Sequence, residues 1–150
     1  LLHLLEKFES LRTGVVMVQA EVADRLAAKP GTKDYGIPSV KAAWWAEVKG
    51  AGSVSRSVFW PAPNVDSKLV SFTRRQTPGD EELRRKVFTI IDAAFAQRRK
   101  MLRSALSSLY GSSSAAEEIL NRAKIDPTLR GEALEIAGFC AIAAVAPDIF

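Results

Sequence analysis

Near the start of the chain, segments with the apolar pattern of a helix alternate with a short continuous apolar run. The apolar residues Leu1 to Leu5 predict one side of a helix that ends near Phe8 to Leu11, and Thr13-Gly14 then interrupts it. The β-branched run from Val15 to Val18 predicts a strand buried on both faces of a mainly parallel sheet. Residues 21–28 predict a second helix.

The following residues, up to about position 76, have mostly strand and loop patterns. A polar Pro-Gly segment at residues 29–35 predicts a loop, and residues 50–56 also have loop composition. Residues 39–48 fit either a helix or a strand, but Trp44-Trp45 and the nearby valines favour a strand. Leu69 to Thr73 predicts a further strand. The order strand, helix, strand, strand predicts the last part of an α/β sheet.

The pattern becomes helical at Thr77-Pro78-Gly79, which we interpret as a boundary between one domain at residues 1–76 and a second at residues 77–150. Asp80 is expected to cap one long helix whose apolar stripe extends to Leu109, and Gly111 is expected to end it.

Three further signals complete the second domain. Ser114 and Glu117 predict a capping box for a helix that extends to about Ala123. Asp126-Pro127 predicts a turn, and the apolar stretch that follows predicts a last, buried helix over residues 132–145. We therefore expect an α/β part followed by a small all-helical domain.

The composition is that of a globular protein. Hydrophobic residues make up 47% of the chain and charged residues 25%, which excludes a disordered protein. No apolar run reaches the roughly 18 residues of a membrane-spanning helix. Cys140 is the only cysteine, so no intrachain disulfide can form, and we expect this side chain in the core. Together with the lack of a signal-peptide pattern, these features favour the cytoplasm.

The net charge of +4 at pH 7 indicates a nucleic-acid partner only weakly, but its distribution is more informative. Arg98, Arg99, Lys100 and Arg103 lie within six residues that contain no acid. On a continuous helix Arg98 falls inside the apolar stripe, where a guanidinium is costly unless it is paired or faces a partner. Three interpretations stay open: a kink in the helix, a cleft that receives phosphate, or a solvated basic face.

The segment from Phe59 to Ser67 is a second candidate site. Pro61 and Pro63 fix the backbone and remove two donors, which predicts a rigid loop. Phe59 and Trp60 on such a loop can stack on an unstacked base. The alternative is that these two aromatic side chains cover the edge of the sheet.

Other catalytic patterns are absent from the sequence. His3 is the only histidine and we expect it to be structural, so neither a Ser-His-Asp triad nor a His/Cys metal cluster can be assembled. No glycine-rich phosphate or dinucleotide loop occurs. Glu47 and Asp66 lie near loops, but nothing marks them as a catalytic pair. We expect no catalytic residue, cofactor site or metal site in this chain.

Five segments together resemble the ribosomal RNA adenine dimethyltransferase family. In chain order they are VQAEVADRL at 18–26, KDYG at 33–36 with SV at 39–40, FWPAPNVDS at 59–67, FAQRRK at 95–100, and IDP at 125–127 with Arg130. Each segment is modest alone, but five in this order cover essentially the whole chain. The sequence departs from the family at Ala20, Ile37 and Asn64, where the family often carries basic residues.

The resemblance implies the last part of a Rossmann-like, S-adenosylmethionine-dependent methyltransferase sheet, followed by a small helical domain that binds rRNA. It places the cofactor loop and the catalytic Asn-Leu-Pro-Tyr motif upstream, so we expect a preceding segment to be missing and this chain alone to be inactive. It implies that Phe59 lies in the pocket for a flipped adenine, to which we add Trp60. The implied rRNA-binding residues, with Arg103 added, are Arg25, Arg98, Arg99, Lys100, Arg103 and Arg130.

The family methylates two adjacent adenosines near the 3′ end of small-subunit rRNA, so the expected partners are this RNA and the small ribosomal subunit. One alternative is a large-subunit rRNA adenine methyltransferase of the erythromycin-resistance type, although the basic run and the Ile-Asp-Pro segment favour the small-subunit enzyme. A second alternative is a non-enzymatic RNA-binding or ribosome-assembly module. A buried-type strand without its expected neighbours also predicts that this chain self-associates.

Overall fold

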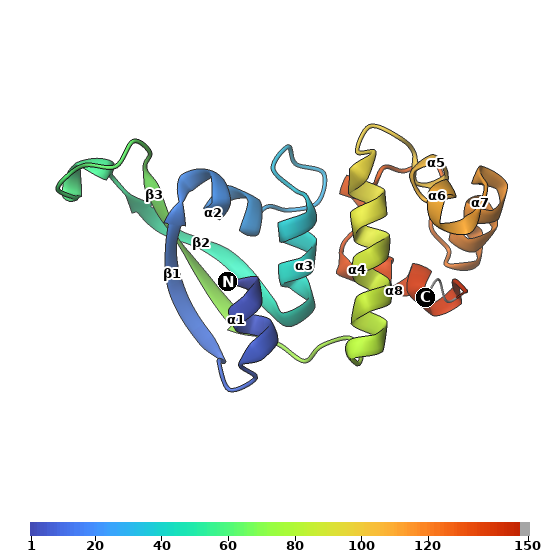
Figure 1. Ribbon diagram of the computed structural model, residues 1–150, viewed down its shortest axis with the longest axis horizontal. Coiled ribbons are helices and arrows are strands. Elements are labelled where there is room, and N and C mark those ends of the chain that lie inside the picture. Colours follow the sequence, from blue (N-terminus) through green and yellow to red (C-terminus); the bar gives the residue numbers. More distant parts are fainter. Residues whose placement is uncertain (148–150) are drawn as a thin grey trace. The chain divides into compact units, whose positions relative to one another are not determined.

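The computed structural model describes residues 1–147 of the chain. It divides into two compact units, Leu1–Gln76 and Thr77–Phe150, and each unit is described by itself. The first unit holds a small sheet with helices, and the regular elements of the second, in its described residues, are helices (Figure 1). An α/β part followed by an all-helical part is therefore confirmed as the class of fold. No helix among residues 1–147 is long and apolar enough to cross a membrane.

The first unit contains three strands, three α-helices and one short 3-10 helix. In chain order its elements are α1 (Leu2–Lys7), β1 (Thr13–Gln19), α2 (Ala20–Leu26), α3 (Ile37–Trp45), β2 (Ala46–Val54), η1 (Arg56–Val58) and β3 (Ser67–Arg74).

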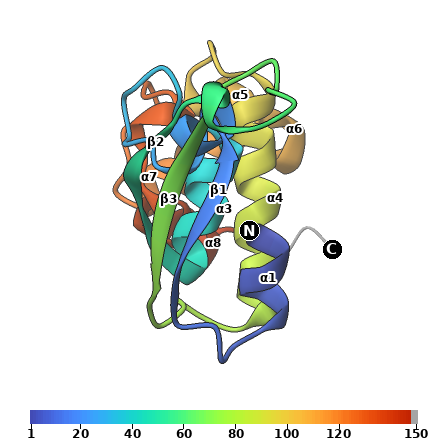
Figure 2. The same cartoon turned by 90° about the vertical axis from the view of Figure 1, so that its left-hand side faces the viewer.

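The sheet has the strand order β1-β3-β2, and Figure 2 shows β3 between the other two strands. Both pairings are antiparallel, with Val16 opposite Val70 and Val48 opposite Phe72. The prediction of a mainly parallel sheet is therefore wrong for the described strands. The two helices α2 and α3 do form a crossover between β1 and β2, which run in the same direction. However, β3 inserts between these strands and pairs with each of them in the opposite direction.

One face of the sheet carries the core of this unit. Val70 lies here with Ala23 and Leu26 of α2 and Ala42 of α3, and the partly buried Val16, Val18 and Val48 pack against them. Phe72 crosses this face above Gly14, where a Cβ atom would lie 2.7 Å from the ring, so the glycine makes room for the phenylalanine.

The other face of the sheet is open in the described residues. Val15 is 59% exposed and Met17 is 49% exposed, so burial in β1 alternates along the strand. The prediction that Val15 to Val18 is buried on both faces is thus wrong for this chain. A continuous apolar run means that either face of the strand could be buried. In this unit the helices cover only the face that carries Val16 and Val18.

The segment from residue 37 to residue 54 also differs from the prediction. Residues 37–45 form α3 and not a strand, and β2 covers residues 46–54, which include the segment expected to be a loop. Ser39 explains the helix, because its hydroxyl accepts a hydrogen bond from the Gly36 amide and donates to the Arg25 carbonyl. Trp44 and Trp45 are both buried, so these large apolar side chains pack in the core from a helix and not from a strand.

The second unit consists of helices. They are α4 (Glu81–Ala96), α5 (Leu102–Ala105), α6 (Ser107–Tyr110), α7 (Ser113–Arg122), the 3-10 helix η2 (Gly131–Ala133) and α8 (Ile136–Val145). Its core is formed by fully buried apolar residues on α4, α5, α7 and α8, among them Val87, Ile90, Ile91, Leu102, Leu120, Phe139 and Ile142.

Helix boundaries in the second unit agree with the sequence in part. Asp80 caps α4 by accepting a hydrogen bond from the Leu83 amide at 2.9 Å, and Gly111, with a φ of 93°, ends α6. The expected single long helix is wrong, because α4 ends at Ala96. Helix α7 is capped by Ser112 and not by Ser114.

Candidate nucleic-acid interface

The aromatic loop, defined as residues 55–66 between β2 and β3, presents its apolar side chains to solvent. Trp60 is 95% exposed and Val58 is 67% exposed, while Phe59 is half-buried. In Figure 1 the loop (green) extends beyond the end of the strands. The alternative that Trp60 covers the sheet edge is therefore wrong, because this indole contacts almost nothing in the described chain.

Arg25, the predicted rRNA-binding residue of the first unit, lies in the last turn of α2. Its guanidinium donates to the Glu21 carboxylate at 2.9 Å, and both side chains are more than half exposed. An exposed ion pair one turn apart on a helix contributes only about 0.3–0.5 kcal/mol. The arginine is thus held in place weakly and is accessible to an anion.

The basic turn, defined as residues 97–103, links α4 to α5. Helix α4 ends before Gln97, and Arg98, Arg99 and Lys100 lie in a turn closed by a hydrogen bond from the Lys100 amide to the Gln97 carbonyl. These residues are therefore not on a helix. The helix therefore breaks before Arg98, as one of the three interpretations of this residue predicts.

The chain from Asp126 to Glu132 packs against the basic turn. The Leu102 amide donates to the Leu129 carbonyl at 2.7 Å, and the Arg103 amide donates to the Pro127 carbonyl at 3.2 Å. The first amides of α5 thus find acceptors in this segment and not in a side-chain cap. Two segments that are about thirty residues apart in sequence are joined into one surface.

Arg98 and Arg103 both have acidic partners in this surface. Arg98 lies 3.4 Å from the Glu132 carboxylate and 6.0 Å from the centroid of the Phe95 ring. Arg103 lies 3.5 Å from the Glu117 carboxylate. Their side chains are 39% and 37% exposed, so each arginine is half withdrawn from solvent and has a structural contact.

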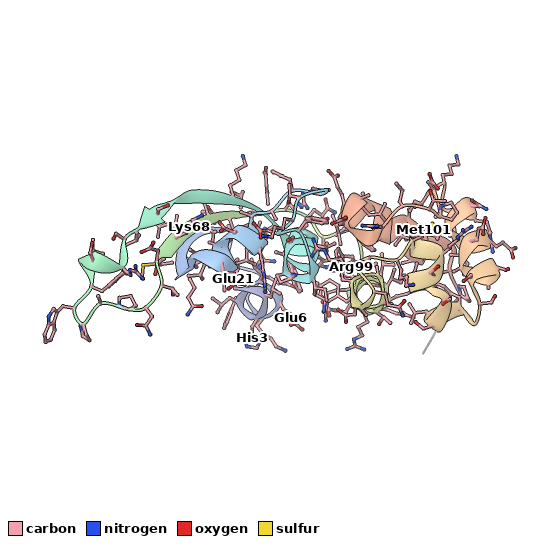
Figure 3. The ribbon with its side chains drawn as sticks, turned by 90° about the horizontal axis from the view of Figure 1, so that it is seen from above. His3, Glu6, Glu21, Lys68, Arg99 and Met101 are labelled. Carbon is pink, nitrogen blue, oxygen red and sulfur yellow. The ribbon has the colours of Figure 1, made fainter. Side chains whose placement is uncertain are left out.

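Arg99, Lys100 and Arg130 are different, because all three are exposed. None of them makes a side-chain hydrogen bond or an ion pair with any residue in the described part of the chain. Arg99 and Met101 are labelled in Figure 3, which shows the side chains around this turn. These three cations are the groups of the basic turn and its neighbouring segment that are available to phosphate oxygens.

The net charge is distributed unevenly between the two units. The first unit has eleven basic and seven acidic residues, so it carries the whole net charge of +4. The second unit has ten basic and ten acidic residues and is neutral overall. A nucleic-acid site in the second unit therefore depends on local clustering at the basic turn and not on the net charge of the unit.

Among residues 1–147, three ionisable groups have displaced pKa values. The Thr128 side chain and amide both donate hydrogen bonds to the Asp126 carboxylate, and these bonds lower its pKa. The same two bonds hold the turn that precedes Arg130. Burial raises the pKa of Tyr110 to about 12 and also raises the pKa of the Cys140 thiol. A thiol with a raised pKa is a poor nucleophile, so Cys140 is not a candidate for covalent chemistry.

The comparisons with known proteins identify the family. The chain belongs to the ribosomal RNA adenine dimethylase family, whose model matches residues 1–146. It is 57% identical over 147 residues to ribosomal RNA small subunit methyltransferase A of Arthrobacter sp. (strain FB24), covering 98% of this chain and 50% of that protein. It is 59% identical to the protein of the same name from Kineococcus radiotolerans, with 98% and 49% covered. The chain thus spans about half the length of the curated relatives that it matches.

Solved structures support the fold. A dimethyladenosine transferase from Plasmodium falciparum matches with a TM-score of 0.75 and 19% identity, covering 93% of this chain and 59% of that one. The 23S rRNA methyltransferase ErmE matches with a TM-score of 0.57 and 19% identity, covering 89% and 54%. The arrangement of the described elements is therefore that of part of an rRNA methyltransferase.

The family implies S-adenosylmethionine as cofactor, and the described residues contain no glycine-rich strand-to-helix turn of the kind that holds a cofactor in related folds. In the dinucleotide-binding α/β folds to which such domains are related, a glycine-rich turn joins a strand to the next helix. Here β1 passes directly into α2 through Gln19-Ala20-Glu21. The glycines with positive φ do not cluster in sequence: Gly31 lies in the loop after α2, Gly52 at the irregularity in β2, and Gly111 at the end of α6. No group of three or more potential metal ligands occurs among residues 1–147.

The sequence does not indicate several contacts that shape these surfaces. Glu132 and Glu117 are partners of Arg98 and Arg103, but each lies more than ten residues away along the chain. The sequence marks Asp66 only as an acid near a loop, whereas its carboxylate accepts a hydrogen bond from the Arg56 amide. The pair Asn64 and Asp66 within a loop between two strands is the available signal, since such residues often bond nearby backbone groups.

Proposed function

We propose that this chain is part of an rRNA (adenine-N6,N6)-dimethyltransferase that methylates two adjacent adenosines near the 3′ end of small-subunit rRNA. The observation that carries the proposal is the family match, which extends from residue 1 to residue 146 and includes both the aromatic loop and the basic turn. The complete protein is this chain together with the segment that its relatives carry beyond it.

The two units have separate roles in this proposal. The first unit, at residues 1–76, is the C-terminal part of a Rossmann-like methyltransferase domain, and the second, at residues 77–150, is the rRNA-binding domain. S-adenosylmethionine supplies the methyl group and is bound outside the described residues. We therefore assign no step of methyl transfer to a residue of this chain.

The residues of this chain act on the RNA. Phe59 and Trp60 receive a flipped adenine by stacking, because an exposed aromatic ring offers a face to any base and stacking contributes about 1–3 kcal/mol per base. Arg99, Lys100 and Arg130 neutralise phosphates, with Arg98 and Arg103 beside them and Arg25 on the first unit. Phosphate contacts position the RNA, and the aromatic pocket holds the reacting base.

The partner is the small ribosomal subunit, and the compartment is the cytoplasm, where ribosomes are assembled. The basic turn supports an RNA partner, since its free cations are accessible and clustered.

A direct test incubates the complete protein with S-adenosylmethionine and undermethylated ribosomal subunits of each size. We expect N6,N6-dimethyladenosine at two adjacent positions near the 3′ end of small-subunit rRNA, located by mass spectrometry of nuclease fragments. Methylation confined to large-subunit rRNA would support the erythromycin-resistance type instead. Binding of rRNA without any methyl transfer would support a non-enzymatic module.

A further inference from the structure

The aromatic loop is closed at its base by two hydrogen bonds that cross it. The Arg56 amide donates to Oδ1 of Asp66 at 3.1 Å, and the Arg56 guanidinium donates through Nη1 to the carbonyl oxygen of Asn64 at 2.8 Å. These bonds join a residue at the start of the loop to two residues at its end. We call Arg56, Asn64 and Asp66 the loop clasp.

One side of the loop clasp is fixed to the sheet by the main chain alone. The Asp66 carbonyl accepts a hydrogen bond from the Ala20 amide at 2.9 Å, and the next residue, Ser67, pairs with Gln19 of β1. The Asp66 side chain is not needed for either contact. Replacing this side chain therefore leaves the start of β3 in place and releases only the Arg56 side of the loop.

Burial holds the half-buried Phe59 only in part, and it does not hold Val58 or Trp60. Trp60 and Val58 are 95% and 67% exposed, so their apolar surface gives them little reason to keep one position. An unrestrained loop loses conformational entropy when a base stacks on it, and this loss lowers the affinity of the loop for the base. The hydrogen bonds of the loop clasp, together with the two prolines, supply the order that burial does not.

We propose that Arg56 and Asp66 are positioning residues that hold Phe59 and Trp60 in place for a flipped adenine, an inference that rests on the proposed function. In this proposal neither residue needs to contact the base. Oδ1 of Asp66 acts as an acceptor for a backbone amide. An amide oxygen serves as such an acceptor without any charge, so the side chain of asparagine preserves the clasp and that of alanine does not.

The test compares Asp66→Ala with Asp66→Asn in the complete protein. We expect Asp66→Ala to lower kcat for methylation of small subunits by about tenfold or more, because misplacement of a reacting group by about 1 Å is that costly. The Kd for rRNA should change by less than about twofold, since phosphate contacts dominate affinity. Asp66→Asn should keep kcat close to that of the wild type.

Loop order is measured separately by fluorine NMR of protein labelled with 5-fluorotryptophan. The Trp60 signal is assigned with Trp60→Phe, and the signals of the buried Trp44 and Trp45 report on the core. We expect Asp66→Ala to narrow the Trp60 line, because a released loop reorients faster, and to leave the two buried signals unchanged. In Asp66→Asn all three signals should match the wild type.

Asp24→Ala is the matched control. Asp24 is an acid of the same unit whose carboxylate pairs with Lys68 of β3 at 2.7 Å and not with the loop clasp. This variant removes the same charge and should keep both kcat and the Trp60 signal. The proposal is overturned if Asp66→Ala keeps the wild-type Trp60 signal, or if Asp66→Asn loses as much turnover as Asp66→Ala. A complete wild-type protein that methylates no rRNA would refute the proposed function, and the NMR comparison would still decide on the loop clasp.

Discussion

Arg98 shows how much the meaning of a single residue depends on contacts distant in sequence. The predicted position of Arg98 inside an apolar stripe is wrong because α4 ends before it, and its partner, Glu132, lies 34 residues further along the chain. Local signals predict well where the whole interaction lies within a few residues, as for Asp80 at the start of α4 and Gly111 at the end of α6. Contacts that only tertiary packing creates have no signal in the sequence.

Tyr110 gives a prediction at this scale. Its hydroxyl oxygen is buried without a hydrogen-bond partner in the described residues, and such a group costs about 1–3 kcal/mol. Tyr110→Phe removes the hydroxyl, so we expect the free energy of unfolding at pH 7 to rise by about 1 kcal/mol in chemical denaturation. A clear decrease would mean that the hydroxyl makes a stabilising contact.

The same substitution has an expected pH dependence. The folded-state pKa of Tyr110 is raised from its ordinary value of 10 to about 12, so above pH 10 the unfolded chain loses this proton while the folded chain keeps it. The free energy of unfolding therefore falls as the pH rises from 10 toward 12. Tyr110→Phe should lose less stability than the wild type over this interval. Parallel curves for the two proteins would contradict the burial of the phenol.

At the scale of elements, the sequence predicts β3 and the last apolar helix, but not α3 or the end of α4. Thr13-Gly14, expected to interrupt the first helix, are instead the first residues of β1, and α1 already ends at Lys7. The helix α3 resembles a strand in sequence because large aromatic residues favour strands in general, whereas here they are buried on a helix that Ser39 caps. Helix α4 ends at Ala96, and the first amides of α5 take their acceptors from the chain between Asp126 and Glu132. The spacing of apolar residues cannot predict hydrogen bonds to a segment so distant in sequence.

The position of the basic turn leads to a prediction for the complete protein. Arg99 and Lys100 are exposed and have no ion pair in the described chain, so each is expected to neutralise one phosphate. The double variant Arg99→Ala/Lys100→Ala should flatten the slope of log affinity for rRNA against log salt by about 1.4–1.8 units, using about 0.7–0.9 per phosphate. Stability should change by no more than about 0.5 kcal/mol per substitution, because both side chains lie on the surface.

Two comparisons make this measurement specific. Arg12→Ala/Arg85→Ala removes the same charge from exposed positions outside the basic turn and should flatten the slope less. Arg98→Ala should also lower stability, since it removes the contacts with Glu132 and Phe95. A wild-type salt slope in the folded Arg99→Ala/Lys100→Ala variant would show that the turn is only a solvated basic surface.

At the scale of the whole molecule, the sheet has an open face and two edge strands, β1 and β2, that pair only with β3 among the described strands. Val15 and Met17 of β1 are exposed on that face. An apolar strand at an edge tends to pair with another chain. We therefore expect the 150-residue chain to self-associate as its concentration rises.

Light scattering over a concentration series measures this tendency. Val15→Lys places a charge on the edge strand and should shift the chain toward the monomer without unfolding it, because the position is 59% exposed. Asn121→Lys, at an exposed position on α7 of the second unit, is the control and should leave association unchanged. A wild-type chain that stays monomeric and binds no dye specific for apolar surface would contradict the prediction.

The central claim is that this chain supplies the RNA-binding side of an adenine dimethyltransferase and lacks its cofactor site. Transfer of labelled methyl groups from S-adenosylmethionine to small ribosomal subunits tests it most directly, with the complete protein and the 150-residue chain assayed side by side. We expect the complete protein to incorporate label into small-subunit rRNA, approaching two methyl groups on each of the two adenosines, and the 150-residue chain to incorporate none. Label transferred by the 150-residue chain alone, or no label transferred to rRNA by the complete protein, would contradict the account.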